Sequence, residues 1–73
     1  MRQGGELLIA FGTRVRDLRL KLGLSQEELA TESGLDRTYV SGIECGKRNV
    51  ALLNVAALAR SLGVSVSELT KGL

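Results

Sequence analysis

The sequence predicts a single all-helical domain built from five helices. Apolar residues recur at the three- and four-residue steps of helix faces, and glycines follow the places where these runs end. No proline interrupts the runs, and no stretch alternates in period two for long enough to predict a strand. Because 73 residues suffice for one domain only, we expect residues 1–73 to fold as one unit, with 1–5 as a flexible start.

The first predicted helix carries one apolar face and ends at Gly23. Glycine tolerates the positive φ that often follows a helix end, so it is a natural stop at this position. The repeated spacing along the helix predicts which side chains turn toward the core. They are Leu7 or Leu8, Phe11, Val15, Leu18 and Leu22.

The second and third helices are short and follow one another closely. Ser25 and Glu28 have the spacing of a capping box, in which each side chain bonds a free backbone N–H of the other residue. This motif predicts a helix over 26–33. Asp36 is a good N-cap residue and predicts a third helix over 37–45.

The fourth helix is predicted over 51–62, and a second capping box opens a short fifth helix. Ser65 and Glu68 supply that box. The fourth helix has more apolar residues than one core face requires. We assign to its core face Leu52, Val55, Leu58, Ala59 and Leu62.

The second and third helices together predict a helix-turn-helix, since only a few residues around Gly34 join them. Ala30 is small, which allows the two helices to cross closely, and Gly34 permits the turn between them. The apolar contacts that set the crossing angle are assigned to Leu29, Leu35, Val40 and Ile43.

Several segments at matching positions resemble the lambda-repressor-like (Cro/Xre) helix-turn-helix family. They are Gly-Leu-Ser-Gln-Glu-Glu-Leu-Ala at 23–30, Gly-Leu at 34–35, Tyr-Val-Ser-Gly-Ile-Glu at 39–44 and Leu-Gly-Val-Ser-Val-Ser-Glu-Leu at 62–69. The similarity extends over about residues 11–70 and implies a five-helix lambda-repressor-like DNA-binding domain. Within the family, 35–44 and 46–49 most resemble the controller proteins of restriction–modification systems, which are small stand-alone dimers.

The resemblance implies that the leading end of the third helix enters the major groove of DNA. There Arg37 can make a bidentate contact to guanine, while phosphate contacts set the register of the protein on the duplex. We assign base contacts to Arg37, Thr38, Tyr39 and Ser41. For Tyr39, the alternatives are a contact to sugar or phosphate and packing on the turn. We assign backbone contacts to Ser25, Gln26, Lys47, Arg48 and Asn49.

Other polar residues receive different interpretations. The resemblance implies a partly buried ion pair between Arg19 and Glu44, which would orient the third helix. Arg14 and Arg16 are interpreted as solvated helix charges, with DNA contact as the alternative.

Two positions depart from the family. Cys45 stands where relatives often carry arginine and is interpreted as an inert small residue, with redox sensing as the alternative. Gly42 lacks a side chain that some relatives use on bases, and is expected to let the helix approach them closely.

The surplus apolar residues of the fourth helix predict a contact surface between two copies of the chain. Several exposed apolar residues close together favour an interface, whereas one alone would carry no meaning. We assign to the homodimer interface Val50, Leu53, Ala57 and Val64.

The predicted function is a sequence-specific transcriptional regulator that binds a short (pseudo)palindromic operator as a homodimer. An antitoxin or phage-type repressor is the alternative function, and a protein-interaction module without DNA binding is a third.

The chain has no histidine and one cysteine, so neither an enzyme, a cofactor nor a metal site is predicted. The expected partners are double-stranded DNA and a second copy, with RNA polymerase as a further candidate. No apolar run is long enough for a membrane span, and the expected location is cytoplasmic.

Overall fold

The computed structural model describes residues 4–73, and these residues form five helices without a strand. The predicted all-helical class is therefore confirmed. α1 begins earlier than expected, because Gly4 and Gly5 lie in its first turn instead of in a flexible start. Residues 1–3 lie outside the described residues. The helices are α1 (Gly4–Lys21), α2 (Gln26–Ser33), α3 (Arg37–Glu44), α4 (Leu52–Leu62) and α5 (Val66–Thr70).

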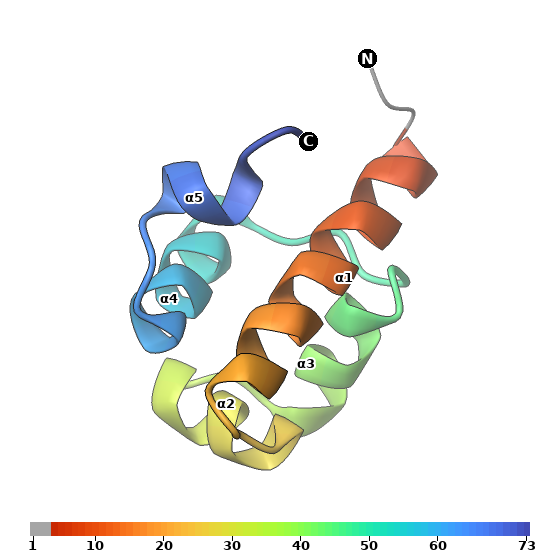
Figure 1. Ribbon diagram of the computed structural model, residues 1–73. Coiled ribbons are helices and arrows are strands. Elements are labelled where there is room, and N and C mark those ends of the chain that lie inside the picture. The colour runs from red at the N-terminus through yellow and green to blue at the C-terminus, as the bar shows by residue number, and fades with distance from the viewer. Residues whose placement is uncertain (1–3) are drawn as a thin grey trace.

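The long helix α1 runs through the middle of the domain (Figure 1). In that view α4 and α5 lie on one side of α1, α3 lies on the other, and α2 lies below. The short helices α2 and α3 pack against each other as a helix-turn-helix, and α4 packs on α2. This arrangement places α3 at the outside of the domain, supported by α1 and α2.

All five helices contribute to one apolar core. Leu29, Val40 and Ile43 are almost completely buried, as their spacing predicts. The ten buried apolar residues are Phe11, Val15, Leu29, Ala30, Val40, Ile43, Leu58, Ala59, Leu62 and Leu69.

Two residues assigned to the core are exposed. Leu52 is 75% exposed because it is the first residue of α4, where the helix extends past the core. Leu22 is 53% exposed because α1 ends at Lys21, so the chain has already left the helix before the apolar spacing returns to that face. Periodicity predicted the correct face of each helix but extended it one residue too far.

The predicted capping boxes are present at the starts of α2 and α5. The backbone N–H of Ser25 donates to the Glu28 carboxylate, and this bond, with the Ser25 hydroxyl, lowers the pKa of Glu28. Gly34 ends α2 at φ +72°, as the turn requires. α3 ends at Glu44, and Cys45, predicted as its last residue, is its C-cap.

Close backbone contact between α1 and α3 depends on Gly12. A Cβ atom at that position would lie 2.1 Å from the carbonyl oxygen of Ile43 and 2.9 Å from that of Glu44. Real side chains do not tolerate such distances to backbone atoms, so only glycine allows this approach. Gly12 therefore sets the position of the C-terminal half of α3 against α1.

Candidate nucleic-acid interface

The leading end of α3 is exposed to solvent. Asp36 caps the helix, since its Oδ2 accepts a hydrogen bond of 2.9 Å from the backbone N–H of Thr38. Arg37 and Thr38 are exposed, whereas Val40 is completely buried one turn along the same helix. Of the predicted base-contact residues, Tyr39 and Ser41 are half-buried. The four residues thus lie on the first turn and a half of one rigid helix, with two side chains fully available.

Three predicted backbone-contact residues, Lys47, Arg48 and Asn49, follow α3 in the loop toward α4. All three are exposed. Two of them add positive charge beside the helix that carries Arg37. Phosphates flank the bases along a DNA groove. The positive charges at both ends of α3 are therefore complementary to the negative charges of a duplex.

The side chain of Arg48 lies back over α3. Its guanidinium carbon is 5.7 Å from the centroid of the Tyr39 ring, and its Cγ would be 2.7 Å from a Cβ at Gly42. The expected close approach of the helix to bases at Gly42 stays a prediction. In the structure, the missing side chain makes room for the aliphatic stem of Arg48.

Ser25 and Gln26, the other predicted phosphate contacts, lie at the start of α2 and are both engaged within the protein. The Ser25 hydroxyl accepts from the backbone N–H of Glu28 at 3.0 Å. The Gln26 amide donates to the carboxylate of Glu44 at 3.0 Å. An amide nitrogen carries two protons, so Gln26 keeps a second donor beyond this bond.

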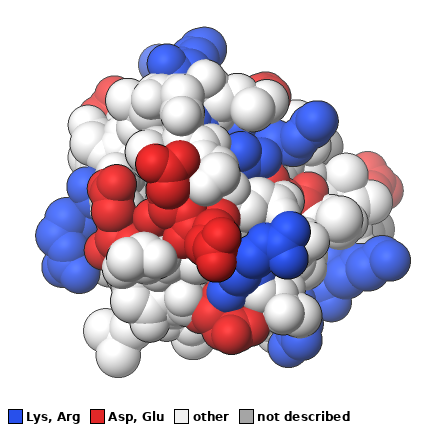
Figure 2. All heavy atoms as spheres, turned by 90° about the horizontal axis from the view of Figure 1, so that it is seen from below, with Lys and Arg blue, Asp and Glu red and all other residues white. Residues whose placement is uncertain are grey.

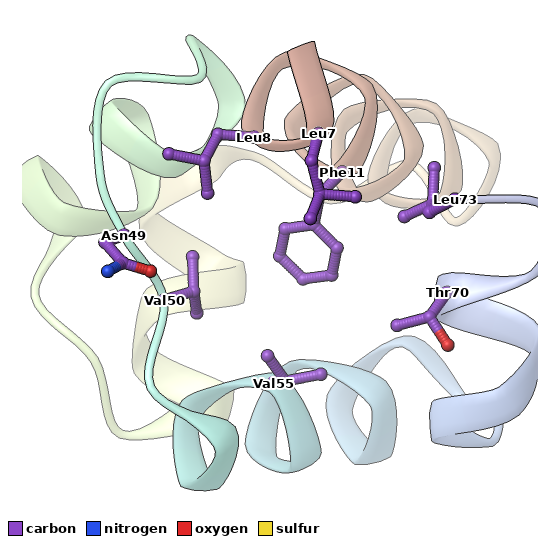
Figure 3. A pocket seen from close by; sticks show the side chains of 8 residues that line it. All are labelled: Leu7, Leu8, Phe11, Asn49, Val50, Val55, Thr70 and Leu73. Atoms are coloured by element: carbon purple, nitrogen blue, oxygen red, sulfur yellow. The ribbon is translucent and has the colours of Figure 1, made fainter. Parts of the chain in front are cut away.

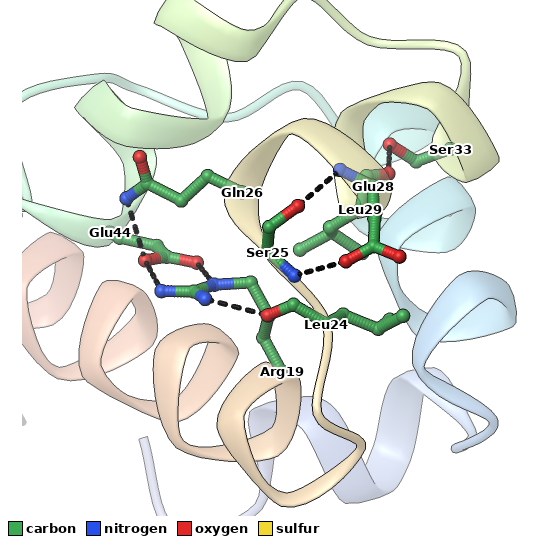
Figure 4. A network of polar contacts seen from close by, with 8 residues as sticks. All are labelled: Arg19, Leu24, Ser25, Gln26, Glu28, Leu29, Ser33 and Glu44. Carbon is green, nitrogen blue, oxygen red and sulfur yellow. Dashed lines mark hydrogen bonds and ion pairs between the residues drawn. The ribbon is translucent and has the colours of Figure 1, made fainter.

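Arg19 and Glu44 form the ion pair that the resemblance implies (Figure 4). Arg19 donates from Nε to one carboxylate oxygen at 2.7 Å and from Nη2 to the other at 2.9 Å. Its Nη1 donates to the carbonyl of Leu24 at 2.8 Å. The hydrogen bond to Glu44 raises the pKa of Arg19. The network joins α1, α2 and α3, and the ion pair at its centre is buried, so it holds the orientation of α3.

Arg14 has a structural role that sequence reasoning missed. Its Nη1 donates to the carbonyl of Glu68 at 2.9 Å, and its Nη2 donates to the carbonyl of Lys71 at 2.8 Å. The interpretation of Arg14 as a solvated charge is therefore wrong. Carbonyls at a helix C-terminus lack partners within the helix and attract cations, so Arg14 caps α5 from a distant part of the chain.

Asn54 is a second polar residue that the sequence analysis did not single out. Its Nδ2 donates to the phenol oxygen of Tyr39 at 3.1 Å and so connects α4 with α3. The only signal for it was a polar residue among the apolar residues of the first two turns of α4. That signal does not say which partner the amide meets.

The residues assigned to a homodimer interface differ in exposure. Leu53 is 83% exposed, and its neighbour Leu52 is also on the surface. Val50 and Val64 are half-buried and pack against the core of their own chain, and Ala57 is half-buried.

A groove of about 400 Å³ lies between α1, the segment before α4, and the C-terminus (Figure 3). The groove is apolar for the most part, and α4 closes one side of it through Val55. Its lining consists of Leu7, Leu8, Phe11, Asn49, Val50, Val55, Thr70 and Leu73. α4 thus contributes Val55 to the groove and carries the exposed Leu52 and Leu53 at its start.

Residues 4–73 contain neither a metal-binding cluster nor a membrane-spanning helix. In that range no cluster of three or more His, Cys, Asp or Glu side chains is placed to hold a metal ion. None of the five helices described has the length and apolar character needed to cross a membrane.

The model of a helix-turn-helix family matches residues 15–69, which include α2 and α3 and most of the core. The chain belongs to this helix-turn-helix family. Among its relatives, control protein C.MunI from Mycoplasma sp is 48% identical over 65 residues, which cover 88% of each protein. Control protein C.BamHI from Bacillus amyloliquefaciens is 48% identical over 62 residues, covering 84% of this chain and 76% of the relative.

Solved structures of helix-turn-helix controller proteins have the same fold. The restriction–modification controller protein C.AhdI from Aeromonas hydrophila superimposes with a TM-score of 0.83 at 55% identity, covering 85% of this chain and 94% of that one. The controller protein C.Esp1396I, as a tetramer in complex with its natural 35 base-pair operator, superimposes with a TM-score of 0.80 at 38% identity. That match covers 86% of this chain and 83% of C.Esp1396I. The resemblance to this helix-turn-helix family, and to its controller proteins, is therefore confirmed.

Proposed function

We propose that this helix-turn-helix protein is a transcriptional regulator of the controller type, which binds a short (pseudo)palindromic operator as a homodimer. The observation that carries the proposal is the exposed leading end of α3, where Arg37 and Thr38 project from a helix whose other face is buried. The similarity to controller proteins supports this regulator over an antitoxin or a phage repressor. The protein acts by binding alone, without a catalytic step, and it acts where the chromosome lies, in the cytoplasm.

In the proposed complex, base reading is divided between the first residues of α3. Arg37 binds guanine through its fork of N–H donors, and Thr38 offers a hydroxyl and a methyl group to a neighbouring base edge. Tyr39 and Ser41, which are less exposed, reach the edge of the site. Lys47, Arg48 and Asn49 bind the sugar–phosphate backbone beside α3, and Ser25 and Gln26 bind it at the start of α2.

Dimerisation is the second part of the proposal. Leu53 and Leu52 are the most exposed large apolar side chains among the described residues. Burying them against a second copy, with Ala57, Val50 and Val64 at the edge of the contact, removes this area from water. A two-fold dimer through α4 places two copies of α3 at a spacing of about 34 Å, one turn of DNA.

Contact with RNA polymerase is a further part of the proposal, and the acidic surface of α2 supports it. Figure 2 views the domain from below, the side on which α2 lies in Figure 1, and acidic side chains gather there. Glu27, Glu28 and Glu32 of α2 are all exposed. In transcription assays in vitro, Glu27→Gln with Glu32→Gln should lower activation while operator affinity stays unchanged. Unchanged activation would remove this partner from the proposal.

The test of DNA reading is a binding selection on random duplexes with the wild-type chain and with Arg37→Ala. The wild type should select a two-fold symmetric site. Arg37→Ala should lose preference at one position in each half-site, where a bidentate contact contributes about 1–3 kcal/mol of discrimination. Arg16→Ala, an exposed arginine of α1, is the matched control and should select the wild-type sequence. An unchanged preference with Arg37→Ala would exclude this residue from base reading, and no selection by the wild type would refute the function.

The test of dimerisation is sedimentation over a concentration series. Leu53→Lys should shift the equilibrium toward monomer, because it places a charge in the proposed apolar contact. Leu22→Lys changes a similarly large exposed leucine elsewhere and should leave the equilibrium as it is. A wild-type chain that remains monomeric at high micromolar concentration would contradict the proposal.

A further inference from the structure

Tyr39 is held by groups from two other parts of the chain. It is the third residue of α3, and its half-buried side chain packs against the core. The guanidinium of Arg48 covers one side of its ring, at 5.7 Å from the centroid. The amide of Asn54, from the first turn of α4, reaches its phenol oxygen at 3.1 Å. The ring and the hydroxyl are therefore both fixed before any ligand is bound.

The direction of the Asn54 hydrogen bond decides what the phenol can do next. An amide nitrogen can only donate, so the Tyr39 oxygen is the acceptor. The proton of the phenol is then left for a different partner. A hydroxyl that accepts one hydrogen bond donates its own more strongly, because linked hydrogen bonds polarise one another. The arrangement thus presents an activated donor beside the exposed end of α3.

We propose that Asn54 is a positioning residue for DNA binding: it holds the Tyr39 phenol as an acceptor and so directs the phenol proton to a phosphate oxygen of the duplex. The inference rests on the proposed function, since it deepens the role of α3 on DNA. Asn54 itself does not touch the duplex. Its effect on affinity passes through the hydroxyl of Tyr39.

The position of Asn54 in the fold gives this contact a second consequence. Asn54 directly follows Leu52 and Leu53, the exposed pair assigned to the subunit contact. In the proposed dimer, the same first turn of α4 meets the partner subunit and holds Tyr39. A rigid helix cannot move at one residue without moving the next, so the subunit contact also fixes the phosphate donor on each α3.

The test is a double-mutant cycle on operator affinity with Tyr39→Phe, Asn54→Ala and the double variant. Tyr39→Phe keeps the ring but removes the donor, and should weaken binding about tenfold or more, as expected for a hydrogen bond to a charged group. Asn54→Ala should weaken the wild type several-fold. In the Tyr39→Phe background it should change affinity by less than about twofold. Additive losses with normal wild-type binding would overturn the positioning role alone.

A readout in the free protein separates this proposal from the proposed function. Tyr39 is the only tyrosine of the chain, so the tyrosine doublet in its Raman spectrum reports the hydrogen bonding of this one phenol. Asn54→Ala should change the intensity ratio of the doublet in the absence of DNA, and an unchanged ratio would refute the contact. If the contact is seen but the wild type binds no DNA, the proposed function fails and the positioning role fails with it.

A second variant guards against loss of folding. Asn54→Asp keeps the size of the side chain but can only accept, so the phenol must donate its proton to it. The doublet ratio should then shift from the value typical of an accepting phenol toward the value typical of a donating phenol. The operator affinity should fall at least as far as with Asn54→Ala. Affinity equal to the wild type would overturn the proposal. Ser61→Ala, on the same helix, is the control and should leave both measurements unchanged.

Discussion

Replacing Glu44 with glutamine tests how α3 is held against the rest of the domain. In the wild type, one carboxylate oxygen of Glu44 accepts from Arg19 Nε, and the other accepts from both Arg19 Nη2 and Gln26. Glutamine keeps the shape but turns one oxygen into an NH₂ group. Whichever oxygen is replaced, two donors then face each other in a buried site, and the charge of Arg19 loses its partner.

The size of the effect follows from burial. The two side chains are 9% and 2% exposed, so water cannot replace the lost partner. Breaking a buried ion pair by removing one charge costs about 3–5 kcal/mol. A domain of 73 residues has roughly 0.05–0.15 kcal/mol of stability per residue, or about 4–11 kcal/mol in total. Glu44→Gln should therefore lower the melting temperature by about 12–40 °C.

Urea unfolding followed by circular dichroism measures this loss. The protomer concentration must be the same for every variant, because dimerisation adds to apparent stability. The midpoint should fall while the slope stays constant, which assigns the change to the folded state. Glu32→Gln, at an exposed position of α2, is the matched control and should stay within about 0.5 kcal/mol of the wild type.

A double variant separates the ion pair from simple packing. Arg19→Met with Glu44→Met removes both charges and keeps apolar bulk, so it should regain most of the stability lost in Glu44→Gln. The reasoning would be refuted if Glu44→Gln lost no more than Glu32→Gln. It would also be refuted if the double variant lost as much stability as the single variants Arg19→Met and Glu44→Met lost together.

Three further predictions concern the supports of the fold. Gly12→Ala should destabilise the domain by about 1–3 kcal/mol in thermal unfolding, because its Cβ meets the backbone oxygen of Ile43; a variant more stable than the wild type would contradict the close contact. Arg14→Met should lower the free energy of unfolding by about 1 kcal/mol and speed hydrogen exchange of the α5 amides. Unchanged exchange would show that Arg14 does not stabilise α5. Because the bonds from Ser25 lower the pKa of Glu28 in the folded state, its stabilising effect exists above the pKa of the unfolded chain and is lost as pH falls through the folded pKa. The stability difference between wild type and Glu28→Gln should thus be present at neutral pH and vanish in acid, and a difference independent of pH would argue against this linkage.

Much of the candidate interface could be predicted from the order of residues along α2 and α3. Exposure of Arg37 and Thr38 follows from the cap at Asp36 and from burial of the opposite face, both of which are local properties of one helix. What could not be predicted is which partners the polar side chains find. Arg48 folds back over Gly42, because loop geometry brings it there.

The sequence by itself determined the five helices and their N-caps at Ser25, Asp36 and Ser65, because capping motifs and apolar spacing act within a few residues of one another. Ser25 with Glu28 marks the start of α2 and Gly34 marks its end, and these signals lie within or directly beside the helix. Only the tertiary structure decided that Arg14 caps α5, that Gly12 allows the close backbone contact between α1 and α3, and that Asn54 donates a hydrogen bond to Tyr39. These contacts join residues far apart in the chain, and their geometry depends on how whole helices pack, which no local pattern encodes.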